Sequence, residues 1–182
     1  MGRSMPTGGK VTSPSLFPPD IAKSAVMSWC LQYRYELRRT WNHAKERILC
    51  FLMLNPSSAD ADIDDPTVRR CIGFGRSLGY DGIVVVNLFA LRATKPTDLL
   101  RHPEPIGPSN DAFIDSAIAE SSFLIAAWGG FPSHKKITAD RTIGVLSRIH
   151  PPRIHVLGET AAGEPQHPLY IPADRKPKRW EP

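Results

Sequence analysis

The stretch IVVVNLFALRAT, residues 83–94, decides the fold. Its apolar run follows the turn residues Gly79-Tyr80-Asp81-Gly82, ends at Asn87 and is followed by basic Arg92. A short, continuously apolar run between turn residues is typical of a strand that is buried on both faces, as in a parallel sheet. The stretch therefore predicts a central strand that ends in an amide side chain.

Three further apolar runs end in the same manner. ILCFLML (48–54) precedes Asn55-Pro56-Ser57, FLIAA (123–127) precedes Trp128-Gly129-Gly130, and RIHVL (153–157) precedes Gly158. In an open α/β sheet, ligands bind in the crevice outside the carboxyl ends of the strands. We therefore expect Asn55, Asn87, Trp128 and the segment after Gly158 to share one rim.

Helical patterns separate these strands. Asp65-Pro66 is a helix-start signature before residues 67–78, and Ser109 or Asn110 and then Ser133 provide caps for two later helices. In the last of these, the apolar positions expected to face inward are Ile137, Ile143, Leu146 and Ile149. Alternation of strands and helices predicts an α/β fold, a three-layer sandwich with a central, mostly parallel sheet.

Residues 33–41 alternate with period two, which predicts a half-buried strand. After a turn at 42–47, this strand is expected to form an antiparallel hairpin leading into the strand at 48. Its basic face contains Arg34 and Arg38, and a solvated face is the favoured interpretation over a contact with phosphate.

The composition indicates one soluble domain. The 182 residues carry 23 Lys+Arg against 18 Asp+Glu, a net charge of +5 that permits a polyanionic partner without requiring one. We expect a disordered segment at 1–23, one domain at 24–174 and a frayed basic tail at 175–182. Cys30, Cys50 and Cys71 form no CxxC pair and are expected to be reduced, buried thiols. With no membrane span or signal peptide predicted, a cytoplasmic location is expected.

The acidic loop at 60–65 has two interpretations. Asp64 and Asp65 are helix caps first, and Asp65 is also a candidate base that activates water near Asn55. A calcium loop is excluded, because Asp65 and Cys71 stand where that motif needs glycine and glutamate. No metal or other cofactor is predicted, although a metal-dependent hydrolase built on residues 60–65 stays an alternative.

From about Ser24 to Pro172 the chain resembles the domain-of-unknown-function family 1643. The resemblance rests on the YRY segment (33–35), the MLNPSSADA and DDPTVRRCIGF blocks within 53–74, VVNLFALRAT (85–94), AAWG (126–129) and HPLY (167–170). The family name implies no chemistry.

A more distant resemblance, to the uracil-DNA glycosylase superfamily, does imply chemistry. It rests on motif order: MLNPS (53–57) is similar to the water-positioning loop, VVNL (85–88) to the base-reading strand, WGG (128–130) to the WG turn and HP (167–168) to the late histidine loop. Met53 and Ser57 replace two glycines and Leu169 replaces a serine, so the expected base is a modified one rather than uracil.

The superfamily resemblance implies a role for each candidate residue. The catalytic residues would be Asn55, which holds water, His167, which stabilises the leaving base, and Asp65; the base-binding residues would be Asn87, Trp128, Pro56 and Ser57. Base flipping requires phosphate contacts and a wedge, and the candidates for DNA binding are Arg34, Arg92, Lys135, Lys136, Leu169 and Tyr170.

Structural roles compete with these assignments. Each Asn can cap a helix, Trp128 can pack in the core, and His167 can be a solvated loop residue. Three function classes therefore stay open: a DNA N-glycosidase, a non-catalytic module that binds a nucleobase, nucleotide or nucleic acid at the same rim, and the metal-dependent hydrolase.

Overall fold

The computed structural model describes residues 21–42, 47–95, 97–130, 135–149 and 154–181, with the side chains of 135–137 excepted. Its strands are β1 (Ala22–Met27), β2 (Arg34–Thr40), β3 (Ile48–Met53), β4 (Gly82–Asn87), β5 (Phe123–Ala126), β6 (Ile154–Val156) and β7 (Lys178–Arg179). Its helices are α1 (Pro66–Ser77), α2 (Thr97–Arg101), α3 (Asn110–Glu120), α4 (Lys135–Leu146) and the 3-10 turn η1 (Pro168–Tyr170).

One seven-stranded sheet runs through the molecule in the order β1-β2-β4-β3-β5-β6-β7. The four apolar runs form its parallel centre, with Met53 of β3 opposite Asn87 of β4 and Leu52 opposite Ala126 of β5. β1, β2 and β7 are antiparallel to their neighbours. The α/β class is therefore confirmed, but the sheet is mixed rather than mostly parallel, with a parallel centre and antiparallel edges.

The predicted hairpin between β2 and β3 is wrong. β2 pairs with β1 and β4 instead, so the apolar strand β4 lies between β2 and β3. This placement also buries both faces of β2: Arg34 is only 3% exposed and Arg39 is 0% exposed. The expectation of a half-buried strand with a solvated basic face is therefore wrong as well.

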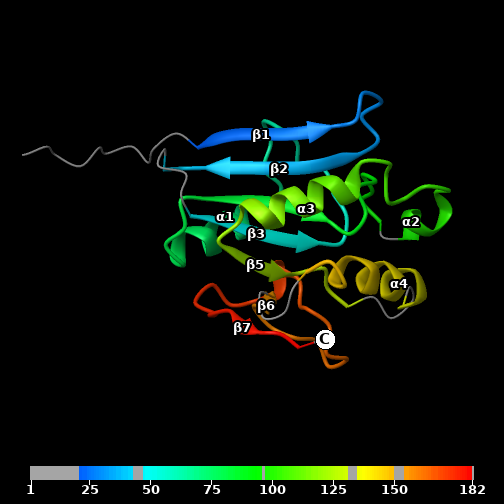
Figure 1. The fold of residues 1–182 in the computed structure, drawn as a ribbon. Coiled ribbons are helices and arrows are strands. Elements are labelled where there is room, and N and C mark those ends of the chain that lie inside the picture. Colours follow the sequence, from blue (N-terminus) through cyan, green and yellow to red (C-terminus); the bar gives the residue numbers. More distant parts are fainter. Residues whose placement is uncertain (1–20, 43–46, 96, 131–134, 150–153, 182) are drawn as a thin grey trace, which may run out of the picture.

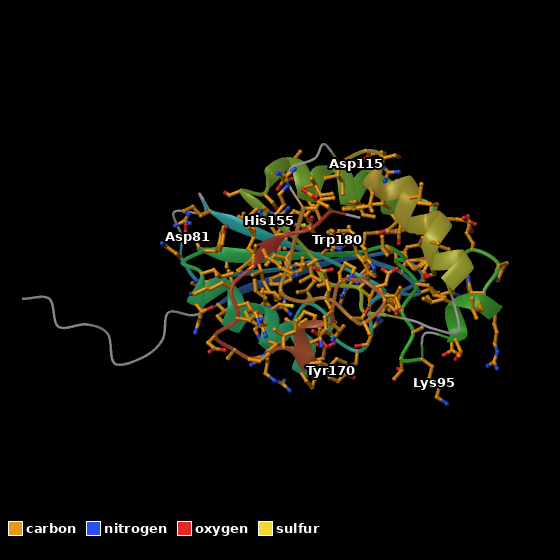
Figure 2. All side chains as sticks on the ribbon, turned by 90° about the horizontal axis from the view of Figure 1, so that it is seen from below. Asp81, Lys95, Asp115, His155, Tyr170 and Trp180 are labelled. Carbon is orange, nitrogen blue, oxygen red and sulfur yellow. The ribbon has the colours of Figure 1, made fainter. Side chains whose placement is uncertain are left out.

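Helices cover both faces of the sheet. α3 and α4 contribute Ile114, Ala117 and Val145 to one apolar core, whereas α1 contributes Val68, Cys71 and Phe74 to the other. Figure 2 shows this arrangement, with Asp115 of α3 and Tyr170 of η1 on opposite sides of the sheet. At α1 the predicted cap is confirmed, because Asp65 accepts a hydrogen bond from the Val68 amide at 2.8 Å and Pro66 begins the helix.

Three local expectations are corrected. Ile143 is 66% exposed, because α4 presents Arg141 and Val145 to the sheet instead. The basic tail is not frayed: β7 pairs with β6, and Trp180 is buried and contacts Trp128 edge to face at 5.4 Å. Cys50 and Cys71 are buried free thiols, but Cys30 is exposed.

Other expectations lie outside the described residues. These are the segment 1–20, most of the turn 42–47 and the cap Ser133. Among the helices that the structure describes, none is long and apolar enough to cross a membrane.

Candidate functional site

The carboxyl ends of β3, β4, β5 and β6 form one edge of the sheet. In Figure 1 the arrows of β3 and β5 point to this edge, and in Figure 2 Asp81, before β4, and Lys95, after it, lie at opposite ends of the sheet. From β3 the chain crosses to β4 on one side and then returns to β5 on the other. In open α/β sheets, ligands bind beside such a reversal of strand order, which here lies between β3 and β5.

Asn55 holds the loop after β3 in place. Its Nδ2 donates to the carbonyl oxygens of Pro56, at 3.0 Å, and Ala93, at 2.7 Å. The Ala93 amide in turn donates to the Pro56 carbonyl at 2.9 Å. The amide nitrogen of Asn55 therefore ties the loop after β3 to the segment after β4.

Asn87 is 2% exposed and belongs to a buried polar layer. Its Oδ1 accepts a hydrogen bond from Nη2 of Arg34 at 3.4 Å, and its carbonyl accepts one from Nδ2 of Asn110 at 2.9 Å. Nη1 of Arg34 donates to the Ala59 carbonyl at 2.9 Å. The structure thus brings Asn87 and Arg34 together beneath the loop after β3, where Arg34 is an internal partner of Asn87 rather than a surface cation.

Burial has an electrostatic consequence for Arg34. Desolvation lowers the pKa of Arg34 to about 10, and the nearby charge of Asp65 opposes this shift. The Nε of Arg34 is buried and has no hydrogen-bond partner among the described residues. The Arg34 guanidinium is thus a buried positive charge that interacts with Asp65.

Asp65 connects α1 to the loop after β3. Its Oδ1 caps α1, and its Oδ2 accepts a hydrogen bond from the Ser57 hydroxyl at 2.8 Å. An ionised carboxylate has about four acceptor positions, so these two bonds leave capacity for a further donor such as water. Ser57 and Asp65, predicted as separate site residues, are in direct contact.

His167 lies close enough to Asp65 for their charges to interact. It precedes η1, and its Nδ1 accepts a hydrogen bond from the Leu169 amide at 3.3 Å. Desolvation lowers the pKa of His167, with the Asp65 charge opposing the shift, so the neutral ring is favoured at pH 7. Because Nδ1 is an acceptor, the proton of the neutral ring is on Nε2, which makes His167 a hydrogen-bond donor.

Arg70 positions the loop that carries His167. Its guanidinium donates to the carbonyl oxygens of Pro168 and Ile171, and it lies over the Phe74 ring at 5.1 Å. A cation in the first turns of a helix opposes the helix dipole, and for Arg70 the carbonyl oxygens of this loop compensate for that. Leu169 and Tyr170 follow on the exposed side of η1.

A cavity of about 510 Å³ opens between the loops after β3 and β4. Ser57, Ser58, Arg92, Thr94 and His102 give it polar walls, and Leu31, Gln32, Leu91 and Ala93 complete its lining. The Nε of Arg92 is buried without a hydrogen-bond partner among the described residues, while Nη1 donates to the Leu31 carbonyl at 3.3 Å. Ser57 thus connects this cavity with Asp65.

Trp128 lines a different cavity, of about 730 Å³, between α4 and residues 159–164. Its indole Nε1 donates to Oε2 of Glu164 at 2.9 Å, and the ring itself is buried. Trp128 therefore lies apart from the cavity that Ser57 and Arg92 line. Lys135 and Lys136 begin α4, but their side chains lie outside the described part of the chain.

The acidic loop uses its carboxylates internally. Asp60 Oδ1 accepts from the amides of Asp62 and Ile63, and Asp64 forms ion pairs with Arg39, at 2.7 Å, and Lys23, at 3.4 Å. Within the described residues, no group of three His, Cys, Asp or Glu side chains has the geometry to hold a metal ion. Arg39, one position of the alternating pattern at 33–41, thus organises this loop through Asp64 and the Asp60 carbonyl.

The comparison with protein families gives one match. The model of DUF1643, a protein of unknown function, matches residues 34–169, about three quarters of the chain. The chain belongs to this family. No curated protein and no solved structure matches it.

The DUF1643 match extends from the start of β2 into η1. It includes every candidate site residue except Tyr170, which directly follows it, and excludes the edge strands β1 and β7. The polar layer, the Ser57–Asp65 contact and His167 are thus features of the matched region.

Proposed function

We propose that this DUF1643 chain is an N-glycosidase that excises a base, modified rather than uracil, from DNA. The observation that carries the proposal is that two groups lie near each other: Asp65, a carboxylate bonded to the Ser57 hydroxyl, and His167, an imidazole whose Nδ1 is engaged as an acceptor. The helices on both faces of a mixed sheet with a parallel centre, and the motif order at the carboxyl edge of that centre, also support a fold of the glycosylase type.

The two groups match the two demands of glycosidic hydrolysis. The reaction passes through an oxocarbenium-like sugar, so a water must be held on one side and the departing base must be stabilised on the other. Asp65, with Ser57, accepts a proton from the water whose oxygen attacks C1′. The C1′–N bond breaks, its electron pair leaves with the base, and Nε2–H of His167 donates a hydrogen bond to the oxygen of that anionic base.

The proposal changes the roles of the two asparagines. Asn55 was expected to hold the water, but its Nδ2 donates to two backbone carbonyl oxygens. We therefore assign it the role of fixing the loop that bears Ser57. Asn87 accepts from Arg34, so we assign it to the buried layer beneath the loop that bears Ser57. Arg92, on the wall of the adjoining cavity, keeps its proposed role toward the DNA backbone.

Two nearly isosteric variants test the proposal. His167→Asn keeps an acceptor for the Leu169 amide but removes the Nε2 donor, and Asp65→Asn keeps the α1 cap but removes the negative charge. DNA duplexes that each contain one modified base are incubated with protein and then with alkali, which cleaves at abasic sites. We expect cleavage of at least one duplex, with about a 100-fold to 1,000-fold lower rate for each variant.

Asp115→Asn is the matched control, because Asp115 is an exposed carboxylate on α3, on the far face of the sheet (Figure 2). Its cleavage rate should equal that of the wild type. The proposal fails if all modified duplexes stay intact, or if His167→Asn and Asp65→Asn both cleave at the wild-type rate.

A non-catalytic module that binds a nucleobase or nucleotide is the second candidate. It is favoured by the cavity beside Ser57, where the buried Nε of Arg92 lacks a partner among the described residues and could meet an anionic ligand. This candidate predicts that nucleotides raise the melting temperature of the wild type and of Asp65→Asn equally, but not that of Arg92→Met. The metal-dependent hydrolase has no comparable support, because Asp60, Asp64 and Asp65 are engaged as described above.

A further inference from the structure

The turn between β1 and β2 exposes apolar side chains on a fixed backbone. The Leu31 amide donates to the Ser28 carbonyl at 2.9 Å, which closes a four-residue turn with Trp29 and Cys30 at its tip. Tyr33 anchors the turn, because its amide donates to the Ser28 hydroxyl at 3.0 Å and its own hydroxyl donates to the Glu104 carbonyl at 3.0 Å. The tip is thus tied to a distant segment of the chain.

Two features of this turn contribute nothing to the stability of the isolated chain, or reduce it, and so point to a contact with a binding partner. Trp29 is 96% exposed and Leu31 is 61% exposed, although burial of such side chains is strongly favourable. Leu31 also has a φ of 60°, a left-handed conformation that a bulky residue adopts only at a cost. A glycine at this position would avoid that strain.

The tip adjoins the basic part of the site. The Leu31 carbonyl accepts from Arg92, and Leu31 lines the same cavity as Ser57 and Arg92. A second cavity, of about 610 Å³, shares Arg92 and His102 with the first and adds Lys95, Asp98 and Arg101, the last two forming an exposed pair at 3.7 Å. In Figure 1 the turn and α2 are both at the end of the sheet to which β3 and β5 point.

We propose that Trp29 is a stacking platform for an unpaired base of DNA, and that Arg92, Lys95 and Arg101 hold the phosphates on either side of that base. An indole that is exposed on a rigid turn can stack on a base with little loss of conformational freedom, and every base offers a face for stacking. Cations at the cavity walls complement the charge of the DNA backbone. The inference rests on the proposed function only in taking DNA as the partner.

Binding of a fluorescein-labelled 12-nucleotide thymidine strand, followed by anisotropy, tests the platform. We expect Trp29→Ala to weaken binding about tenfold and Trp29→Phe to keep most of the affinity, because a phenyl ring still stacks. Ile143→Ala, which truncates another exposed apolar side chain on α4, should bind like the wild type. Added strand should also quench the tryptophan emission of the wild type far more than that of Trp29→Ala, because Trp128 and Trp180 are buried and Trp41 is partly buried, with its indole Nε1 bonded to the Tyr80 carbonyl.

The platform is overturned if Trp29→Ala binds as tightly as the wild type, or if the wild type does not bind the strand. It is also overturned if sedimentation shows a dimer that Trp29→Ala dissociates, because the tip would then contact a second copy of the chain. Its failure differs from failure of the glycosidase. If binding depends on Trp29 but no abasic sites form, only the catalytic proposal is rejected. If the wild type and Trp29→Ala form abasic sites equally, only the stacking platform is rejected.

Discussion

His167 links the proposed chemistry to a measurable pH dependence of stability. Desolvation lowers the pKa of His167 in the folded protein, so the unfolded chain takes up the proton first as the pH falls. The stability that depends on the neutral ring is therefore complete above the ordinary histidine pKa, near 6.5, and declines below it.

We expect the free energy of unfolding, from urea titrations between pH 7.5 and 5, to fall less steeply for His167→Asn than for the wild type. Other groups titrate in both proteins, so the difference between the two slopes isolates His167. Equal slopes would show that the ring is as solvated in the folded protein as in the unfolded chain.

Arg39 provides the second residue-scale prediction. It is fully buried and donates to Asp64 and to the carbonyl oxygens of Asp60 and Ser24. Removal of one partner of a buried ion pair costs about 3–5 kcal/mol, so Arg39→Ala should lower the free energy of unfolding by that amount. Arg101→Ala, which breaks a surface pair with Asp98, should cost less than about 1 kcal/mol. Similar losses for the two variants would contradict the buried role of Arg39.

At the residue scale, sequence reasoning identified side chains but not their neighbours. Asp65 was expected both as a cap and as a site residue; its bond from the Val68 amide confirms the cap, and the site role stays a prediction. The engagement of Asn55 by the Ala93 carbonyl and of Asn87 by Arg34 joins residues far apart in the chain. No local pattern specifies such contacts, because they depend on the order of strands in the sheet.

Helix α1 contains an internal comparison that tests its packing. A Cβ on Gly75 would lie 2.7 Å from Ile83 Cγ2 and 2.8 Å from the Trp41 ring, whereas a Cβ on Gly73 would meet nothing within 4 Å. Gly75→Ala should therefore destabilise the protein by about 1–3 kcal/mol. Gly73→Ala should stabilise it by up to about 1 kcal/mol, because alanine is the better helix former. Thermal unfolding of both variants decides this, and equal shifts would mean that α1 does not pack on β4 as described.

At the scale of elements, local sequence patterns predicted the positions of strands and helices, but they did not predict which strands pair in the sheet. The four parallel strands and α1 were predicted from apolar runs and from Asp65-Pro66, signals that lie within each element. The partner of β2 was predicted wrongly. Proximity in the chain favoured β3, but in the sheet β4 lies between β2 and β3. Ile143 shows the same limit, since its helix turns a different face toward the core.

At the scale of the whole molecule, the C-terminal segment packs onto the sheet through Trp180. Trp180 packs against Trp128, and its indole Nε1 donates to the Gly163 carbonyl at 3.2 Å, which joins β7 to the wall of the larger cavity. Trp180→Ala should lower the free energy of unfolding by about 3–5 kcal/mol. Arg179→Ala, at an exposed neighbouring position, should have an effect within about 0.5 kcal/mol. A Trp180→Ala protein as stable as the wild type would mean that the tail is not part of the fold.

The central claim is that water, held at Asp65, attacks the sugar of a nucleotide in DNA. Mass spectrometry of DNA that contains a mixture of modified bases, incubated with the protein in H₂¹⁸O, tests it most directly. The account predicts a free base in solution and one ¹⁸O atom on the sugar left behind, both lost in Asp65→Asn. DNA that keeps every base, or a base released equally by Asp65→Asn, would contradict it.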